Sequence, residues 1–371
     1  MLKVGITGQN GFIGSHLLNF LKLKKDIQLI PFDDNYFNDE NILTNFVNSC
    51  DVVVHLAAVN RHHQADVIYE TNINLVKKLI NALDNSPNKP KVLFSSSTQE
   101  ERDNAYGKSK KIGRELLQNW AKKNNAEVIS LIIPNVFGPF GKPFYNSVIS
   151  TFSYQLVNNL EPKIEIDAVL KLIYINDLIN IFFELITKKS SEQVYYVPFS
   201  KEISVSSILD ILKNFKDLYL FQNIIPRFND NFERDLFNTF RSYIDLQKHY
   251  PRYLIKNEDN RGYLTELVKE YSGGQIFYSI TKPGITRGNH FHIRKIERFC
   301  VIKGEAIIKL RKVGTSEVIS FEVNGDDPSF IDIPIWFTHN ITNIGKDDLV
   351  TLFWSNEIYN PDEPDTYFED V

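Results

Sequence analysis

The sequence predicts a doubly wound α/β domain with a parallel sheet, followed by an all-β barrel of the jelly-roll type. Three observations support this fold class. The first half of the chain alternates short apolar strands with amphipathic helices, as βαβ units do. A glycine-rich turn, Gly8 to Gly14, joins the first strand to the first helix. From about Tyr253 the helical period gives way to short alternating strands separated by Gly, Pro and Asn–Asp turns.

Length and composition agree with two well-filled domains. The chain has 371 residues, more than one compact core usually contains, and 43% of them are hydrophobic. Lys and Arg total 42 against 46 Asp and Glu, without blocks of like charge, so we expect no nucleic-acid partner. We place the first domain at residues 1–247 and the second at 253–371, with a linker around His249 to Arg252.

The sequence also indicates where the protein resides. Its longest apolar runs fall short of a membrane span. A strand begins at Lys3 and leaves no room for a signal peptide. The two cysteines, Cys50 and Cys300, lie far apart in apolar surroundings, which favours reduced thiols. We therefore expect a cytoplasmic protein without a membrane partner.

The glycine-rich turn predicts a dinucleotide site. It stands between a strand at 2–7 and a helix at 15–23, with glycines at three-residue spacing. Such glycines allow a tight turn, a close approach of the backbone to a pyrophosphate, and close helix packing. The free N–H groups of the helix N-terminus then face the phosphates. The expected cofactor-binding residues here are Gly8, Gly11, Phe12, Ile13 and Gly14.

The next two strands supply the rest of the expected cofactor pocket. A strand at 27–32 ends at Asp33, and an acidic side chain there usually accepts a hydrogen bond from the ribose 2′-hydroxyl. With no arginine close by in the sequence, this position favours NAD over NADP. The apolar run at 51–58 ends in small residues, so Ala57 is expected to line the adenine–ribose pocket. His55, inside that run, is interpreted as a core histidine.

Tyr106 and Lys110 form the candidate catalytic pair of the first domain. Four residues apart on a helix, they project from the same face. A phenol with a pKa of ~10 is a poor acid–base catalyst at neutral pH, and a nearby ammonium lowers that pKa. The preceding strand ends in hydroxyls, among them Ser97. We predict that Tyr106 protonates a substrate oxygen, that Lys110 lowers its pKa and holds ribose, and that Ser97 orients the carbonyl.

Together these motifs resemble the extended short-chain dehydrogenase/reductase family, whose members act largely on nucleotide sugars. The resemblance covers about residues 1–245, and implies NADP(H) rather than the NAD that Asp33 alone favours. Pro134 to Pro139 matches the family's substrate loop, which makes Asn135 an implied substrate residue. Only eight residues separate Ser97 from Tyr106, so we expect a shortened loop over the site.

Four spaced residues in the second domain predict a metal site. His290 and His292 are two apart and face the same way on a strand, Glu297 follows across a hairpin, and His339 comes later. Three imidazoles and one carboxylate suit a borderline divalent cation, and zinc, manganese, iron and nickel all remain open. The pattern Gly284-x5-His290-x-His292-x4-Glu297-x6-Gly304 resembles the cupin family, although Trp336 stands where its second motif usually has glycine. The resemblance favours Zn²⁺.

A reductase followed by a metal cupin resembles the bifunctional enzymes of capsular polysaccharide synthesis. The resemblance implies that the cupin epimerises C3 of a UDP-activated 4-keto-6-deoxy-N-acetylhexosamine in the pathway to a UDP-N-acetyl-L-fucosamine precursor. The reductase then reduces C4 with NADPH and gives UDP-2-acetamido-2,6-dideoxy-L-talose. It also implies a homodimer formed through the cupin domain.

Three other functions fit parts of the same sequence. A sugar 4-epimerase would retain NAD, and its cupin would only dimerise the chain. A non-catalytic cofactor sensor would have no need of Tyr106 and Lys110, which are both present. A purely structural metal in the cupin would hold a dimer together. The sequence names no acid–base residue in the cupin.

Overall fold

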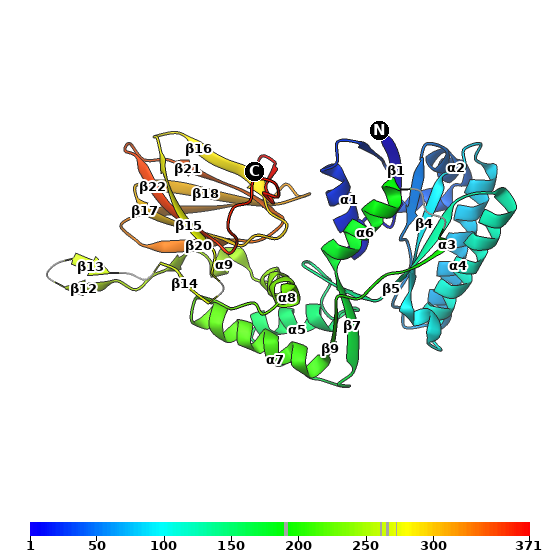
Figure 1. Cartoon of the computed structure of the whole chain (residues 1–371), viewed down its shortest axis with the longest axis horizontal. Coiled ribbons are helices and arrows are strands. Elements are labelled where there is room, and N and C mark those ends of the chain that lie inside the picture. The colour runs from blue at the N-terminus through cyan, green and yellow to red at the C-terminus, as the bar shows by residue number, and fades with distance from the viewer. Residues whose placement is uncertain (189–191, 260–261, 265–266, 272) are drawn as a thin grey trace. The chain divides into compact units, whose positions relative to one another are not determined.

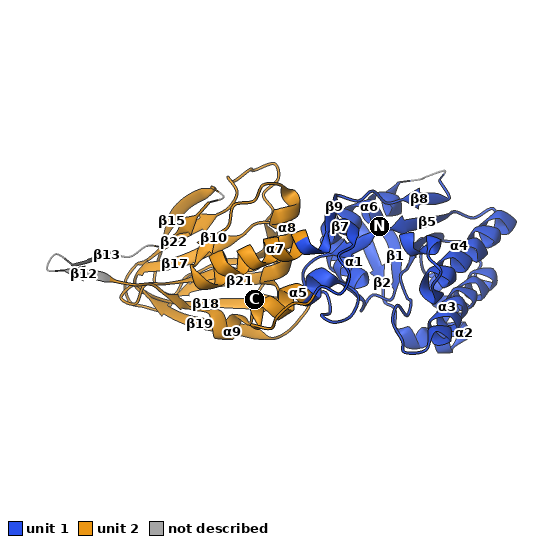
Figure 2. Ribbon diagram, turned by 90° about the horizontal axis from the view of Figure 1, so that it is seen from below, with its two compact units in different colours: residues 1–151, 164–206 blue, residues 152–163, 207–371 orange. Residues whose placement is uncertain are grey.

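The computed structural model describes residues 1–188, 192–259, 262–264, 267–271 and 273–371. Its contacts divide the chain into two compact units (Figure 2). The N-terminal unit comprises residues 1–151 and 164–206, and the C-terminal unit comprises 152–163 and 207–371. Residues 207–247 thus pack with the barrel, whereas the sequence groups them with the reductase. The functional boundary between 247 and 253 remains a prediction.

The N-terminal unit is built on a parallel six-stranded sheet, as the βαβ pattern predicts. Its strand order is β2-β1-β3-β4-β5-β8, so the direction of strand addition reverses between β1 and β3. The central strands β1, β3, β4 and β5 are largely buried and predominantly apolar, whereas the edge strands β2 and β8 are more exposed. Their bounds are β1 Leu2–Thr7, β2 Ile27–Ile30, β3 Val52–His55, β4 Lys91–Ser97, β5 Val128–Ile133 and β8 Val194–Tyr196.

Helices cover both faces of this sheet (Figure 1). Helices α1 and α6 pack together on one face, and α2, α3 and α4 form a continuous layer on the other. Trp120, Leu79 and Phe94 belong to the apolar core beneath that second layer. The confirmed fold class is therefore the Rossmann-like doubly wound sheet. The helix bounds are α1 Phe12–Lys22, α2 Glu40–Asn48, α3 Ala65–Asn85, α4 Ala105–Asn124 and α6 Ile175–Thr187.

Shorter elements complete the N-terminal unit around the ends of the sheet. A second, three-stranded sheet has the order β6-β7-β9. Two 3₁₀ turns lie after strands of the sheet: η1 begins at Asp34, shortly after the end of β2 and next to Asp33, and η2 directly follows β4 and Ser97. Their bounds are β6 Asn135–Phe137, β7 Val169–Tyr174, β9 Lys201–Ser204, η1 Asp34–Asn38 and η2 Thr98–Glu101.

The C-terminal unit contains two five-stranded antiparallel sheets, which confirms the predicted all-β barrel. One sheet has the order β11-β20-β17-β22-β15 and the other β19-β18-β21-β16-β23. The bounds of the first are β11 Arg252–Tyr253, β20 Ser329–Ile333, β17 Glu297–Lys303, β22 Leu349–Ser355 and β15 Gln275–Thr281. Those of the second are β19 Val318–Asn324, β18 Glu305–Lys312, β21 Phe337–Asn343, β16 Thr286–Phe291 and β23 Tyr367–Phe368.

Helices of the C-terminal unit pack against the outer face of the first sheet. Arg298 of β17 and Asp332 of β20 are fully buried there, and the phenol of Tyr219 donates a hydrogen bond to Asp332. The remaining helical elements are α5 Val148–Val157, α7 Val205–Phe215, η3 Lys216–Phe221, α8 Asn231–Arg241 and α9 Leu246–His249. Two short strand pairs complete the chain: β10 Ile224–Ile225 pairs with β14 Lys269–Glu270, and β12 Asn257–Asp259 pairs with β13 Gly262–Leu264. Among the described helices, none has the length and apolarity to cross a bilayer.

Candidate active site and metal centre

The glycine-rich turn lies where the strand order reverses, the place where open α/β sheets bind nucleotides. Gly8 has a φ of 71°, and a Cβ there would stand 2.7 Å from the backbone nitrogen of Ala57. A Cβ on Gly14 would stand 2.2 Å from the carbonyl oxygen of Gly8. Both positions therefore require glycine. The turn brings Gly8 and Ala57 together, as the expected cofactor pocket demands.

The same turn is tied to the end of β2. Nε2 of Gln9 donates to the carbonyl oxygen of Phe32 at 2.5 Å, which places Asp33 close to the glycines. Asp33 is exposed, and its carboxylate accepts the backbone N–H of Asn35 at 2.8 Å as the N-cap of η1. One oxygen of Asp33 thus serves a local turn, so its presence at this position is a weak indicator of the cofactor.

Tyr106 and Lys110 lie on the first turns of α4. Asn104 caps this helix, its side chain accepting the backbone N–H of Gly107 at 2.7 Å. Nζ of Lys110 is buried, donates to the carbonyl oxygen of Ser95 at 2.8 Å, and lies 5.7 Å from the centroid of the Tyr106 ring. Ser97 is partly buried at the end of β4, and its Oγ accepts the backbone N–H of Gln99. The expected catalytic residues thus come from adjoining elements.

The electrostatics of this pair differ from the prediction. Burial, together with the neighbouring phenol of Tyr145, raises the pKa of Tyr106 to about 12. Burial lowers the pKa of Lys110 to about 8, although Glu100 opposes that shift. Without a cofactor, desolvation therefore outweighs any effect of the ammonium on the phenol. The lowering of the tyrosine pKa by Lys110 remains a prediction for the cofactor-bound enzyme.

The short connection between Ser97 and Tyr106 is filled by η2. Glu100 in this turn accepts a hydrogen bond from the hydroxyl of Ser96, and Arg114 of α4 donates to both its oxygens at 2.7–3.1 Å. Gly107 allows the contact between turn and helix, since a Cβ there would stand 1.9 Å from the carbonyl oxygen of Gln99. Strand β4 and helix α4, which carry the candidate catalytic residues, are therefore held against each other. Sequence reasoning missed Glu100 and Arg114, because fourteen residues separate them.

Two further polar side chains are buried near the pair. Nδ2 of Asn72 donates to Oγ of Ser109 at 3.0 Å, while its Oδ1 accepts the backbone N–H of Val59 at 2.7 Å. Nδ1 of His55 lies 2.7 Å from Oγ1 of Thr7. Burial and the charge of Lys110 lower the pKa of His55 to about 3, so it is a neutral core histidine, as interpreted from the sequence. Asn72 ties α3 to the catalytic helix, which no local sequence signal indicates.

Asn135 begins β6, and its side chain is exposed. Its strand pairs in parallel with β7 through the register Asn135↔Leu172. Its contact with substrate remains a prediction.

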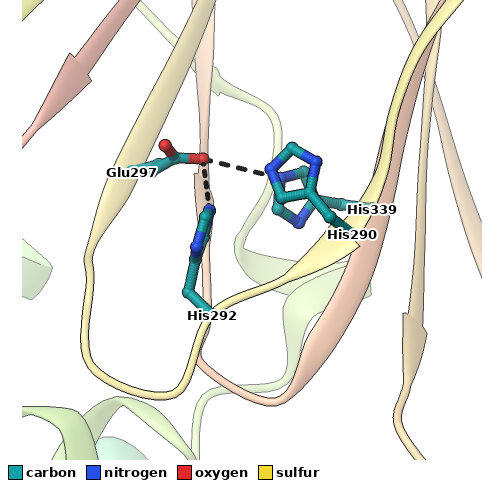
Figure 3. Close-up of side chains that lie close together, drawn as sticks. All are labelled: His290, His292, Glu297 and His339. Atoms are coloured by element: carbon teal, nitrogen blue, oxygen red, sulfur yellow. Dashed lines mark ion pairs between the residues drawn. The ribbon is translucent and has the colours of Figure 1, made fainter. Parts of the chain in front are cut away.

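The four residues of the predicted metal site converge in the barrel (Figure 3). His290 belongs to β16, His292 follows it, His339 belongs to β21, and Glu297 begins β17 in the opposite sheet. One ligand atom from each lies within 4.8 Å of the others. Oε2 of Glu297 stands 3.0 Å from Nε2 of His292 and 3.5 Å from Nε2 of His339.

The hydrogen bonds of this cluster leave its inner nitrogens available. Nδ1 of His292 contacts the carbonyl oxygen of Asp365 at 2.5 Å, and Nδ1 of His339 contacts that of Phe337 at 3.2 Å. Among the described residues, the buried Nε2 atoms of both imidazoles lie near the carboxylate of Glu297 but form no hydrogen bond of good geometry. Buried polar atoms without a well-directed hydrogen bond are costly, so nitrogen and oxygen donors arranged in this way fit a borderline divalent cation.

Titration in the cluster follows from burial and from the single carboxylate. Burial and the two neighbouring imidazoles lower the pKa of His290 to about 3. Burial works against ionisation of Glu297, but His292 and His339 outweigh it and hold the pKa of Glu297 well below its usual range. Burial likewise opposes the charge on His292, but Glu297 raises its pKa. A carboxylate and a neutral imidazole are the forms that metals bind.

Trp336 resolves the departure from the second cupin motif. It has a φ of 62°, the left-handed conformation that glycine usually supplies. Its backbone N–H donates to the carbonyl oxygen of His292 at 2.7 Å, and its ring stacks on Phe291 at 5.5 Å. The turn geometry expected for glycine is therefore kept, and packing of the buried indole offsets a backbone cost of ~1–2 kcal/mol.

Two family models match the chain. The model of the NAD-dependent epimerase/dehydratase family matches residues 4–197. The model of the polysaccharide biosynthesis C-terminal domain matches residues 257–367. The two matches fall on the doubly wound sheet and on the barrel.

Similar proteins cover the chain from end to end. A Pseudomonas aeruginosa protein named UDP-2-acetamido-2,6-beta-L-arabino-hexul-4-ose reductase is 32% identical, over 99% of this chain and 98% of its own length. The crystal structure of the capsular polysaccharide assembling protein CapF from Staphylococcus aureus covers 100% of both chains, with 34% identity and a TM-score of 0.64. RMD from Pseudomonas aeruginosa, solved with NADPH, shares the fold over 58% of this chain and 83% of its own (20% identity, TM-score 0.52). The chain therefore belongs to the NAD-dependent epimerase/dehydratase family, and within it to the CapF-like proteins that carry a polysaccharide biosynthesis C-terminal domain.

Proposed function

We propose that this protein is a bifunctional nucleotide-sugar enzyme of capsular polysaccharide biosynthesis. Its barrel epimerises C3 of a UDP-activated 4-keto-6-deoxy-N-acetylhexosamine, and its N-terminal unit then reduces C4 with NADPH. The product is UDP-2-acetamido-2,6-dideoxy-L-talose. One observation carries the proposal. A chain similar over its whole length to a hexul-4-ose reductase holds both a Tyr–Lys pair beside a dinucleotide turn and a separate cluster of metal-binding side chains.

The two reactions make chemical sense together. The 4-ketone acidifies the hydrogen at C3, so a proton leaves that carbon and another returns to its opposite face. Epimerisation alone leaves a mixture of C3 epimers. Reduction of the ketone removes the acidifying group, which stops further exchange and draws the mixture towards one product.

In the barrel, His290, His292, Glu297 and His339 are the residues that would hold the cation, for which we propose Zn²⁺. When bound, it would supply Lewis-acid polarisation of a substrate oxygen. Glu297 brings the one negative charge to this donor set, and the buried walls exclude water, which strengthens electrostatic interactions inside the barrel.

In the N-terminal unit, the chain's own residues position the ketone and deliver a proton. Reduced nicotinamide, when bound, supplies the hydride that C4 gains. Tyr106 donates its phenolic proton to the C4 oxygen, Ser97 donates a hydrogen bond that orients the same oxygen, and Lys110 holds the ribose. The raised pKa of Tyr106 keeps the phenol protonated before the reaction, the state in which it acts as an acid.

A solvent-deuterium assay tests the division of labour. Deuterium uptake at C3 is measured by mass spectrometry without NADPH, and C4 reduction is followed separately by oxidation of NADPH. We expect Tyr106→Phe to abolish reduction and to keep exchange, whereas His290→Ala abolishes exchange. Exchange that survives in His290→Ala would contradict the assignment of epimerisation to the barrel.

The competing 4-epimerase function predicts different behaviour. Such an enzyme would carry tightly bound NAD after purification and would need no added reductant. Its barrel would serve only a dimer, so a chelator would leave turnover unchanged. We propose instead that the protein binds NADP(H) reversibly and that the expected homodimer forms through the barrel, which sedimentation analysis can measure.

A further inference from the structure

The C-terminal tail, residues 356–371, wraps the part of the barrel that carries the metal-binding side chains. Strand β23 of this tail pairs with β16, with Phe368 opposite His290. The backbone N–H of Glu369 donates to the carbonyl oxygen of Asn289 at 3.0 Å, and Arg311 forms an ion pair with Glu369 at 2.8 Å. The tail is therefore an integral edge of the second sheet.

Asp365 occupies the centre of this tail. It is 5% exposed and adopts a left-handed backbone with a φ of 46°. Asp is one of the few residues besides glycine that tolerate this conformation. Its carbonyl oxygen lies 2.5 Å from Nδ1 of His292. In the neutral imidazole, the form that metals bind, a proton on Nδ1 donated to this carbonyl leaves Nε2 of His292 free to act as a ligand on the side of Glu297.

The carboxylate of Asp365 organises the loop between two of the metal-binding residues. Its oxygens accept the backbone N–H groups of Ile293 at 3.2 Å, Arg294 at 3.0 Å and Lys295 at 2.8 Å. The next backbone N–H, that of Ile296, donates at 2.8 Å to the side chain of Asn356, also in the tail. Two tail residues therefore satisfy every backbone donor between His292 and Glu297.

Charged side chains fasten the tail to the same loop. Arg294 donates to Glu357 at 2.9 Å and to Glu363 at 3.0 Å, and both glutamates belong to the tail. Hydrogen bonds from backbone N–H groups to an ionised carboxylate are stronger than neutral ones. The loop between His292 and Glu297 is consequently held in place by hydrogen bonds and ion pairs with side chains of the tail.

We propose that Asp365 is a positioning residue for the metal centre, which fixes the orientation of His292 and the spacing between His292 and Glu297. The proposal depends on the metal assignment made above, but not on the reaction. Groups that orient metal ligands without touching the metal typically change metal affinity 10- to 100-fold when they are removed.

Asp365→Asn is the informative substitution. Asn keeps the size of the side chain and tolerates the left-handed backbone, but it has one acceptor oxygen for the three backbone donors. Its NH₂ group must face at least one N–H. The matched control is Asp362→Asn, an exposed aspartate of the same tail. Both variants are compared with the full-length parent and with His339→Ala, which removes a ligand.

Zn²⁺ affinity is measured by competition with a chelating dye, and the d–d absorption of the Co²⁺-loaded protein reports the ligand geometry. We expect Asp365→Asn to bind Zn²⁺ at least tenfold more weakly and to alter the Co²⁺ spectrum, while Asp362→Asn stays within twofold of the parent. An affinity and a spectrum unchanged in Asp365→Asn would overturn the proposal, as would an equal loss in Asp362→Asn.

Two further measurements keep the test decisive. If Asp365→Asn does not fold, Asn356→Ala removes only the acceptor for Ile296, and we expect a several-fold loss of Zn²⁺ affinity. An unchanged affinity in Asn356→Ala would then refute the role of the tail. If His339→Ala binds Zn²⁺ as tightly as the parent, the metal assignment itself fails. A loss in His339→Ala without one in Asp365→Asn contradicts the positioning role alone.

Discussion

The ammonium of Lys110 donates a hydrogen bond to the carbonyl oxygen of Ser95 at 2.8 Å, in the interior of the N-terminal unit. A buried ammonium with one strong acceptor is poorly solvated, and its pKa falls to about 8. The interaction joins the catalytic helix to the strand that carries the serines. It also makes the stability of the cofactor-free protein depend on pH.

We expect the stability of the parent relative to Lys110→Met to increase between pH 8 and pH 10.5. Below pH 8 the lysine is charged in both the folded and the unfolded protein, and the folded state bears the full burial cost. Between about 8 and the ordinary lysine pKa of 10.5, the unfolded chain binds more protons, so the free energy of unfolding rises with pH. The rise is at most ~1.4 kcal/mol per pH unit. Urea unfolding of both proteins from pH 7 to 10 measures it, and a constant difference would contradict the lowered pKa.

Tyr106→Phe is expected to lower the rate of C4 reduction by at least ~10²-fold, the range that a general acid contributes. Phenylalanine keeps the ring contacts but has no proton to donate. The rate is measured by NADPH oxidation with the C3-epimerised ketone. Tyr154→Phe, on α5, is the control, and we expect it to retain near-parental activity. A comparable loss in the control would point to a general structural effect.

Gly14→Ala is expected to destabilise the cofactor-free protein more than Gly11→Ala. A Cβ at position 14 would stand 2.2 Å from the carbonyl oxygen of Gly8, whereas one at position 11 would stand 3.3 Å from the same atom. The first contact forces the backbone of the turn to move, and the second requires a shift of a few tenths of an ångström. Thermal unfolding without cofactor provides the comparison. Equal melting temperatures would show that the turn is less tightly packed than the structure describes.

Asp332→Ala is expected to destabilise the C-terminal unit by about 3–5 kcal/mol, because it leaves a buried guanidinium without its partner. Arg298 donates to Asp332 at 2.7 and 3.0 Å, and both side chains are buried. The control is Asp348→Ala, which breaks the exposed ion pair with Lys282 at 2.8 Å and costs less than ~1 kcal/mol. Chemical denaturation followed by tryptophan fluorescence measures both. Similar costs would show that the buried pair is not strongly coupled.

Removal of metal is expected to separate the two activities. A chelator should abolish deuterium uptake at C3, because without the cation the three imidazoles and the carboxylate provide no Lewis acid to polarise the substrate oxygen. Reduction of a pre-epimerised ketone should continue, because Tyr106, Lys110 and Ser97 belong to the other unit. Added Zn²⁺ should restore exchange. Loss of both activities on chelation would contradict the separation of the sites.

Local sequence patterns determined the fold class and indicated most of the candidate site residues. Glycine spacing depends on backbone sterics, which act over a few residues, so Gly8 and Gly14 indicate the candidate cofactor turn without any tertiary information. The i, i+4 spacing of Tyr106 and Lys110 and the two-residue spacing of His290 and His292 likewise follow from the periods of helix and strand. One family model matches residues within the predicted first domain and the other matches residues within the predicted second.

Only the tertiary structure decided which long-range partners complete these motifs and what charges they carry. The pKa of Tyr106 depends on burial, and burial depends on the whole unit, so the spacing to Lys110 could not give its direction. The Glu100–Arg114 clamp joins residues fourteen positions apart. Asp365, seventy-three residues after His292, reaches the loop between His292 and Glu297 because the tail forms the edge strand of the second sheet. Residue periods are local properties of the chain, whereas desolvation and these contacts arise when distant segments pack together.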